Sequence, residues 1–106
     1  MTQIEVETLI RSIIGRYVDT NDFFVFLFGS RAAQTSRPNS DYDIGIFGEK
    51  KIPFALIAKI KDELDNYPIP VNIDIIDFST VSDDFKKLAL KEIKIWNKPK
   101  KNLKLI

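Results

Sequence analysis

The sequence contains neither cysteine nor histidine. The lack of cysteine excludes disulfides, thiolate nucleophiles and thiolate–metal sites. The lack of histidine excludes serine–histidine hydrolysis, histidine as a general base and histidine-bound zinc. Carboxylates that act together with a hard cation are therefore the leading catalytic groups that remain.

An excess of one charge and a long apolar run are also lacking. The 16 basic and 15 acidic residues leave a net charge of +1, which argues against a nucleic-acid polymer as partner. No apolar run approaches the roughly 18 residues of a membrane span, and the first ten residues do not resemble a signal peptide. We therefore expect no membrane association and a cytoplasmic location. With 106 residues, 44% of them hydrophobic, the chain fits one small globular domain.

The spacing of apolar residues predicts alternating helices and strands. Helical spacing runs from Ile4 to Tyr17, from Pro53 to Leu64 and after Ser82, and strand patterns cover 23–28, 41–46, 71–75 and 93–96. A short helix is expected after Ser30. This order predicts an α/β (α+β) domain over residues 1–97, in which helices pack on a small mixed sheet. Residues 98–106 form a basic tail that we expect to fray.

Three aspartates are placed so that they could share one face of that sheet. Asp41 and Asp43 lie two residues apart on a strand, so their side chains leave the same face. Asp74 lies between Ile73 and Ile75, whose side chains are expected to project to the opposite face of the strand. If the two strands are neighbours, three carboxylates converge and repel each other unless a cation compensates them. Mg²⁺ with a polyphosphate matches such an all-oxygen set of ligands.

A glycine–serine turn precedes the first aspartate. Gly29 lets the backbone approach a ligand closely, and the turn after it can present N–H groups and the Ser30 hydroxyl to a phosphate. Arg31 can add positive charge for a triphosphate or for the acidic residues. Gly45, on the acidic face, is expected to leave space over the sheet. Each fragment alone is ordinary, since glycine–serine turns and solvated Asp-x-Asp pairs are common; their joint order and spacing carry the prediction.

These residues carry a resemblance to a known family. The run Leu27-Phe28-Gly29-Ser30-Arg31-Ala32, followed by Ser40-Asp41-Tyr42-Asp43-Ile44, resembles the signature of the polymerase-β-like nucleotidyltransferase superfamily. Ile73-Asp74-Ile75 matches the apolar–Asp–apolar context of that family's third carboxylate. The resemblance extends from Phe23 to Trp96, implies a polymerase-β palm-like fold, and points to the minimal nucleotidyltransferase (MNT) branch.

The resemblance implies a set of roles. Gly29 and Ser30 would contact the triphosphate, and we group Arg31 and Ser40 with them as nucleotide-binding residues. Catalysis and metal binding would fall to Asp41, Asp43 and Asp74, which would hold a pair of Mg²⁺ ions, with Mn²⁺ as an alternative. One residue departs from the pattern, because Gln34 occupies a position where the family usually has glycine. Gln34 would be strained if its φ is positive, so that binding survives while turnover falls.

Members of this size are commonly paired with a helical protein of the HEPN class, and several pairs resemble toxin–antitoxin modules. The first hypothesis is therefore an enzyme that transfers a nucleoside monophosphate, with AMP preferred, from a nucleoside triphosphate to a hydroxyl on a partner protein or small molecule. The chain has no second domain to hold the acceptor, so a partner would supply it. The alternative is a catalytically weak antitoxin or nucleotide-binding module that acts by complex formation. A homodimer through the edge strand at 93–96 is a further expectation.

Overall fold

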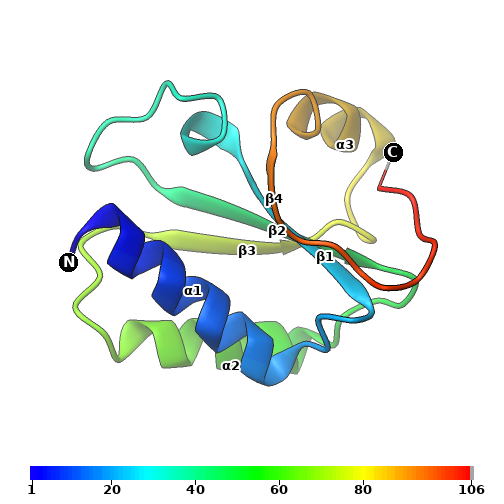
Figure 1. Ribbon diagram of the computed structural model, residues 1–106, viewed down its shortest axis with the longest axis horizontal. Coiled ribbons are helices and arrows are strands. Elements are labelled where there is room, and N and C mark those ends of the chain that lie inside the picture. The colour runs from blue at the N-terminus through cyan, green and yellow to red at the C-terminus, as the bar shows by residue number, and fades with distance from the viewer. Residues whose placement is uncertain (106) are drawn as a thin grey trace.

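A four-stranded mixed sheet organises residues 1–105, the part of the chain that the computed structural model describes. The strand order is β3-β2-β1-β4, in which β2 and β3 are parallel and the other neighbours are antiparallel. Figure 1 shows α1 and α2 on one face of the sheet and α3 on the other. The predicted fold class is confirmed. In chain order the elements are α1 (Gln3–Tyr17), β1 (Phe23–Phe28), the 3₁₀ helix η1 (Gly29–Arg31), β2 (Tyr42–Gly48), α2 (Phe54–Asp65), β3 (Ile73–Asp77), α3 (Asp83–Ala89) and β4 (Lys94–Asn97).

The parallel pairing of β2 and β3 follows from the helix between them. Parallel neighbours need a long crossover connection, and α2 with its flanking loops supplies it. At the start of the chain, Thr2 caps α1 through a reciprocal pair of hydrogen bonds with Glu5. No helix within residues 1–105 is long and apolar enough to cross a membrane.

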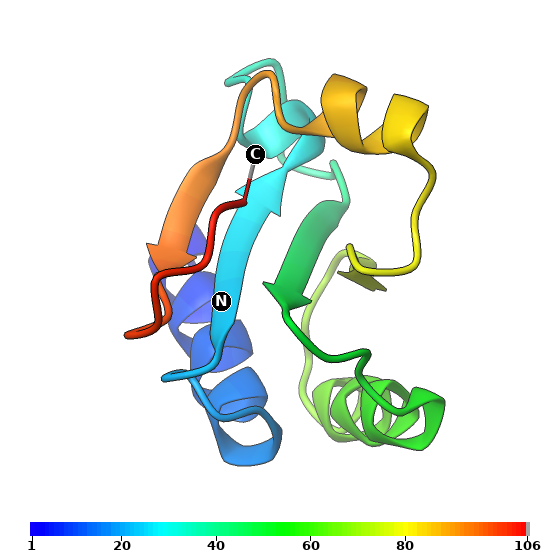
Figure 2. The same cartoon turned by 90° about the vertical axis from the view of Figure 1, so that its right-hand side faces the viewer.

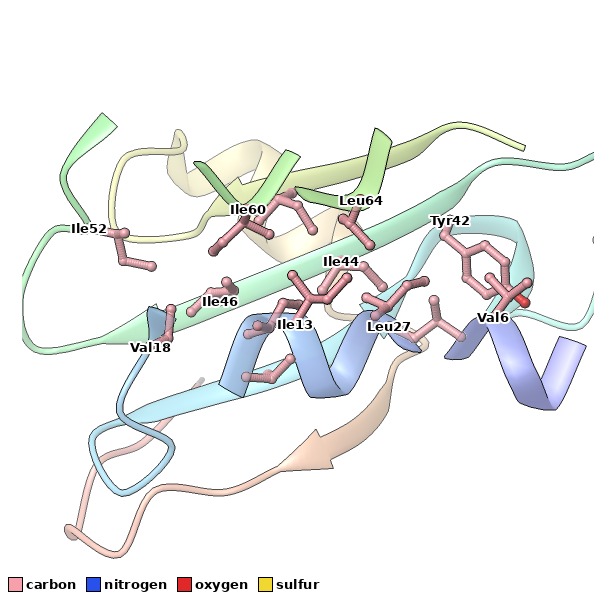
Figure 3. Packing of buried hydrophobic residues seen from close by; sticks show 14 of the residues in the cluster. Val6, Ile13, Val18, Leu27, Tyr42, Ile44, Ile46, Ile52, Ile60 and Leu64 are labelled. Carbon is pink, nitrogen blue, oxygen red and sulfur yellow. The ribbon is translucent and has the colours of Figure 1, made fainter. Parts of the chain in front are cut away.

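An aliphatic core fills the space between the sheet and the helices α1 and α2. The residues of β2 that alternate with the acidic positions, such as Ile44 and Ile46, are completely buried there. Figure 3 shows them facing Ile13 of α1 and Ile60 of α2. The period-two pattern of β2 therefore orients the strand as predicted, with its apolar side toward the helices.

The other face of the sheet carries an aromatic core beneath α3. Its buried residues are Phe24, Phe26, Phe28, Phe78 and Leu105. The ring of Phe78 meets those of Phe26 and Phe28 edge to face, at centroid distances of 4.8 and 5.1 Å. Such pairs add about 0.5–1.5 kcal/mol each beyond the apolar area they bury. Because β1 contributes to both cores, its uninterrupted apolar run reflects burial on both faces.

Two expectations about this face are wrong. Gly45 does not leave open space, because the Phe26 ring lies where a Cβ of residue 45 would stand. The C-terminal segment is not a loose tail in the structure, since Leu105 is buried against the aromatic core and the Lys101 ammonium lies 3.0 Å from the Asp22 carboxylate. The amide of Lys100 also donates to the carbonyl of Asn21 over 2.9 Å. The last residue of the predicted tail, Ile106, lies outside the described residues.

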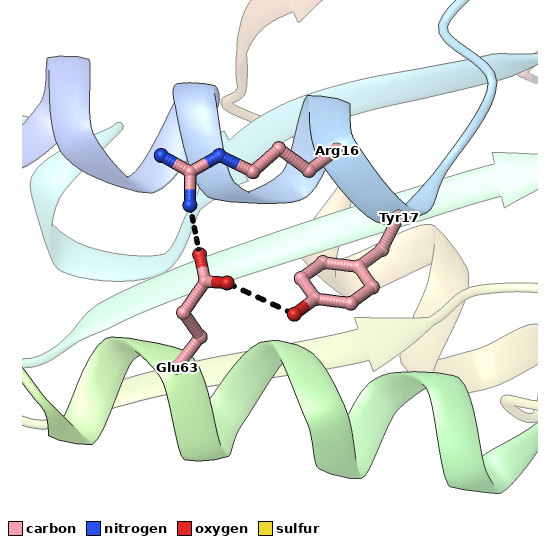
Figure 4. A network of polar contacts seen from close by, with 3 residues as sticks. All are labelled: Arg16, Tyr17 and Glu63. Atoms are coloured by element: carbon pink, nitrogen blue, oxygen red, sulfur yellow. Dashed lines mark hydrogen bonds and ion pairs between the residues drawn. The ribbon is translucent and has the colours of Figure 1, made fainter.

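The helices α1 and α2 are tied together by one carboxylate. Glu63 of α2 accepts hydrogen bonds from the Arg16 guanidinium at 2.6 Å and from the Tyr17 hydroxyl at 2.9 Å (Figure 4). The Arg16 side chain is more than half exposed, so the ion pair contributes little compared with the apolar contacts below it. The cores, rather than this bridge, hold the helices on the sheet.

We expect Gly45→Ala to destabilise the protein by about 1–3 kcal/mol, because the added methyl group overlaps the buried Phe26 ring. Urea unfolding measures the change. A matched control is Gly15→Ala in α1, where a Cβ meets no atom within 4 Å and removal of a helical glycine stabilises by about 1 kcal/mol. Unchanged stability of the Gly45 variant would show that Phe26 does not require the glycine.

Candidate functional site

Asp43 and Asp74, here called the acidic pair, are direct neighbours across the parallel strands β2 and β3. Residues paired in register project to the same face, and adjacent strands lie about 4.7–4.9 Å apart. The two carboxylates therefore stand side by side above the sheet, on the face that carries the aromatic core. The sequence could place each on a face, but only the strand order makes them neighbours.

Asp41 lies at the entrance to this pair. It precedes the first residue of β2 and is exposed, whereas Asp43 is half-buried. In the part of the chain that the structure describes, no group of three acidic side chains is close enough to hold a metal ion as a ready-made cage. The three carboxylates therefore do not converge as expected: Asp43 and Asp74 are paired, and Asp41 lies outside the strand pairing.

The acidic pair carries uncompensated negative charge. Partial burial raises the pKa of Asp43 above its ordinary value of 3.8, and the charges of Asp74 and then Asp41 add to the rise. Within residues 1–105 neither Arg31 nor a lysine forms an ion pair with Asp43. A hard divalent cation fits this set of oxygen donors, because it would relieve the repulsion and carboxylates are the ligands it prefers.

Gly29 packs directly against the acidic pair. Its φ is +73°, a conformation that suits glycine, and a Cβ on it would collide with the carboxyl group of Asp43. The carbonyl of Gly29 accepts hydrogen bonds from the amides of Ala32 and Ala33 at 3.1 Å each, which closes the tight turn of η1. The positive φ therefore favours glycine at position 29, and a side chain there would also displace the Asp43 carboxylate, so the turn lies next to Asp43.

A hollow of about 520 Å³ opens beside this turn, between η1 and α3. Gly29 and Ser30 form one wall, and the exposed side chains of Phe85 and Leu88 form another. Lys91 and Glu92 place charges of both signs at the rim. The hollow gives the predicted phosphate-binding turn access to a ligand with both apolar and polar parts.

Arg31 does not point toward the acidic pair. Its guanidinium is buried, donates to the carbonyl of Ser40 at 2.8 Å and to that of Pro38 at 3.4 Å, and lies 4.0 Å from the centre of the Tyr42 ring. Tyr42 projects to the face opposite Asp43, so the charge of Arg31 lies on the other side of the sheet from the acidic pair. We correct its role to that of a brace for the loop before β2.

Ser40 belongs to the same brace. Its hydroxyl accepts a hydrogen bond from the Arg37 amide at 2.8 Å, and its carbonyl is held by Arg31. Both contacts lie inside the loop that leads into Asp41, so Ser40 helps to fix the start of β2. Nothing in the local sequence distinguishes an arginine that binds phosphate from one that binds backbone carbonyls.

Two further side chains, Gln34 and Asp77, lie near these elements. Gln34 has φ +60°, which meets the condition under which strain is expected at this position. Asp77 is buried at the end of β3 and accepts hydrogen bonds from the Ile52 amide at 2.8 Å and from the Ser79 amide at 3.0 Å. Because Asp77 is three residues from Asp74 on a strand, it points to the opposite face and serves the fold.

Comparison with known proteins identifies the family of the chain. Residues 8–101 match the family described as polymerase beta nucleotidyltransferase, and the chain belongs to that family. It is 28% identical over 83 residues to the "Probable protein adenylyltransferase MntA" of Haemophilus influenzae, a match that covers 78% of this chain and 71% of that protein. The chain is thus a nucleotidyltransferase domain related to MntA.

Solved structures share the fold. A chain of a toxin–antitoxin complex with AMP-PNP superposes with a TM-score of 0.70 at 19% identity, over 87% of this chain and 73% of that one. A chain of the complex between a tri-AMPylated HEPN toxin of Shewanella oneidensis and its MNT antitoxin gives a TM-score of 0.69 at 16% identity, over 92% and 74% of the two chains. At these identities the similarity establishes the fold.

We expect Asp43→Asn to raise the melting temperature of the metal-free protein at neutral pH. Because the pKa of Asp43 is raised in the folded protein, ionisation of this carboxyl lowers the free energy of unfolding. The loss is absent at a pH below the pKa of Asp43 in the unfolded chain, and it is complete at a pH above its pKa in the folded protein. The advantage of the variant should therefore grow as pH rises from about 4 through the folded pKa and then stay constant. Thermal melts in EDTA measure it, with the exposed Asp62→Asn as control; an advantage that shrinks as pH rises through this window would contradict the expectation.

Gln34→Gly should stabilise the protein by up to about 1 kcal/mol, since relief of the positive φ outweighs the added chain entropy. Urea unfolding compares it with Gln34→Ala, which keeps a Cβ and should bring no gain. A glycine variant less stable than the alanine variant would refute the strain at this position.

Proposed function

We propose that the chain transfers a nucleoside monophosphate, AMP in the first instance, from a nucleoside triphosphate to a hydroxyl group of a partner protein. The observation that carries the proposal is the acidic pair, Asp43 beside Asp74, with the glycine–serine turn packed against it. Relatives support the choice of nucleotide and acceptor, because one is named a protein adenylyltransferase and another structure holds a tri-AMPylated toxin with its antitoxin.

Each group of residues at the site has its own role in this proposal. The acidic pair and Asp41 would bind Mg²⁺, or Mn²⁺, together with phosphate oxygens. When bound, the metal would neutralise negative charge on the triphosphate and on the leaving pyrophosphate. Gly29 and Ser30 would bind the triphosphate beside the hollow near α3. Without the charge of Arg31, phosphate neutralisation at this face depends all the more on a metal.

Asp74 is the residue best placed to meet the acceptor. It is exposed and stands on the outermost strand of the sheet, while Asp43 is half-buried behind it. Its carboxylate would orient the acceptor hydroxyl and take its proton as the oxygen bonds to the α-phosphorus. The bond between the α-phosphorus and the β-phosphate oxygen breaks at the same time, and pyrophosphate leaves.

A HEPN-class protein is the partner that we propose as acceptor. Structures of related fold are toxin–antitoxin complexes, one of them with a HEPN toxin. The second candidate function is neutralisation of such a partner by binding alone. The positive φ at Gln34 favours it, since backbone strain close to η1 can weaken turnover without preventing complex formation.

The test uses the protein, the HEPN-class partner proposed above, Mg²⁺ and ATP labelled at the α-phosphate. We expect label on the partner, none in EDTA, and a loss of at least about 100-fold in Asp74→Asn. The matched control Asp62→Asn, an exposed aspartate of α2, should transfer normally. Competition with unlabelled GTP, CTP and UTP tests the preference for ATP.

The same assay separates the two candidate functions. Full transfer by Asp74→Asn would refute the role of the acidic pair. Absence of label, combined with inhibition of the partner that persists in the Asp43→Asn and Asp74→Asn variants, would favour neutralisation by binding.

A further inference from the structure

The outer edge of β3 is not covered by another strand. The strand order leaves β3 at the end of the sheet, and Figure 2 shows it beyond β2 with no strand of residues 1–105 on its far side. Unpaired edges present a row of backbone N–H and C=O groups that can bind another chain. The identity of the residues that face outward therefore determines what this edge can bind.

The register identifies those residues. The carbonyl of Asn72 accepts from the amide of Tyr42 at 3.0 Å, and the amide of Phe78 donates to Ile46 at 2.9 Å. In a parallel ladder alternate residues face the partner strand, so even-numbered residues of β3 pair with β2 and the N–H and C=O groups of Ile73 and Ile75 face outward.

The edge is closed at one end and open at the other. At the end of β3, the carbonyl of Asp77 is occupied by the Thr80 amide at 3.1 Å and the Thr80 hydroxyl at 2.8 Å. No loop or side-chain hydrogen bond within residues 1–105 uses the backbone of Ile73 or Ile75. The open part of the edge is thus the part that flanks Asp74.

A hollow of about 350 Å³ lies along this open part, here called the edge hollow. It reaches from Lys61 and Asp65 of α2, past Tyr67, to Asp74. The edge hollow is therefore continuous with the candidate site through Asp74. It offers one positive and one negative side chain, besides Asp74, to whatever lies against β3.

We propose that the open edge of β3 binds an extended segment of the acceptor protein, which adds a strand beside β3 and places a hydroxyl side chain next to Asp74. The proposal rests on the proposed function and names how its acceptor is held. A residue opposite Asp74 would share its face, with Cβ atoms about 4.5–5.5 Å apart. Its two neighbours would project to the α2 side and into the edge hollow.

An extended segment suits this edge better than a helix does. A helix satisfies its own backbone and would leave the groups of Ile73 and Ile75 without partners. An added strand supplies a hydrogen-bond partner for the backbone N–H and for the C=O of both Ile73 and Ile75. The side chains of the added strand, which alternate between the two faces, then provide specificity. Lys61 and Asp65 would select the residues that flank the hydroxyl.

The test is binding, with no transfer step. The probe is a pooled library of nine-residue peptides with a central tyrosine, serine or threonine, passed over the immobilised protein with Mg²⁺ and AMP-PNP. The retained pool is added to ¹⁵N-labelled protein, and amide hydrogen exchange is followed by NMR. We expect at least tenfold slower exchange at Ile73 and Ile75, while Asp74 and Ile76, already paired with β2, change little.

Protein variants check the backbone contact. Ile73→Pro removes one outward N–H without touching the β2–β3 ladder, and Ile73→Ala is its control because it shortens the same side chain but keeps that group. The proline variant should retain the pool roughly three- to tenfold more weakly than the alanine variant. Both variants should bind AMP-PNP alike, which verifies that the site is folded.

Three outcomes would overturn the proposal: no peptide retained, protection elsewhere than at Ile73 and Ile75, or equal retention by the proline and alanine variants. Because no AMP is transferred, the result is independent of the labelling assay. If the amides of Ile73 and Ile75 are protected but no AMP is transferred in the labelling assay, the docking edge stands and the proposed activity is refuted. If AMP is transferred but these amides are not protected, the activity stands and the docking edge is refuted.

Discussion

Parallel, in-register pairing of β2 with β3 is the constraint on which the site depends. It sets Asp43 and Asp74 beside each other, so two like charges share one small area of the sheet. Such an arrangement opposes folding unless a cation joins it, as the raised pKa of Asp43 indicates. The protein tolerates the cost because the same strands bury Ile44, Ile46 and Ile75 on the opposite face.

The two faces of the sheet have separate tasks. The aliphatic face packs against α1 and α2 and buries side chains of β1, β2 and β3 in one core. The aromatic face, beneath α3, carries the acidic pair at one end and packs Gly29 against Asp43. Arg31, buried on the Tyr42 side, holds the loop that leads into β2. Burying an arginine among backbone carbonyls thus gives the site its geometry without giving it positive charge.

Placement at a sheet edge connects the site to its proposed acceptor. Asp43 is half-buried between β1 and β3, whereas Asp74 stands on the last strand with unpaired backbone on either side of it in sequence. The chain belongs to the polymerase beta nucleotidyltransferase family and is similar to MntA. Its acidic pair lies beside the open edge of β3, which we propose as the binding site for a protein substrate. The proposed transfer and the proposed docking edge meet at one side chain.

The sequence by itself determined what depends on near neighbours in the chain. Period two assigned Asp43 and Asp74 to the polar sides of their strands, and the long apolar run marked β1 as central. Only the tertiary structure decided that β3 lies next to β2 and that Leu105 packs on the core. It also decided two side-chain positions: Phe26 fills the space above Gly45, and Arg31 turns away from the acidic pair. These features join residues far apart in sequence or depend on where a flexible side chain finds its partners, and local periodicity carries no information about either.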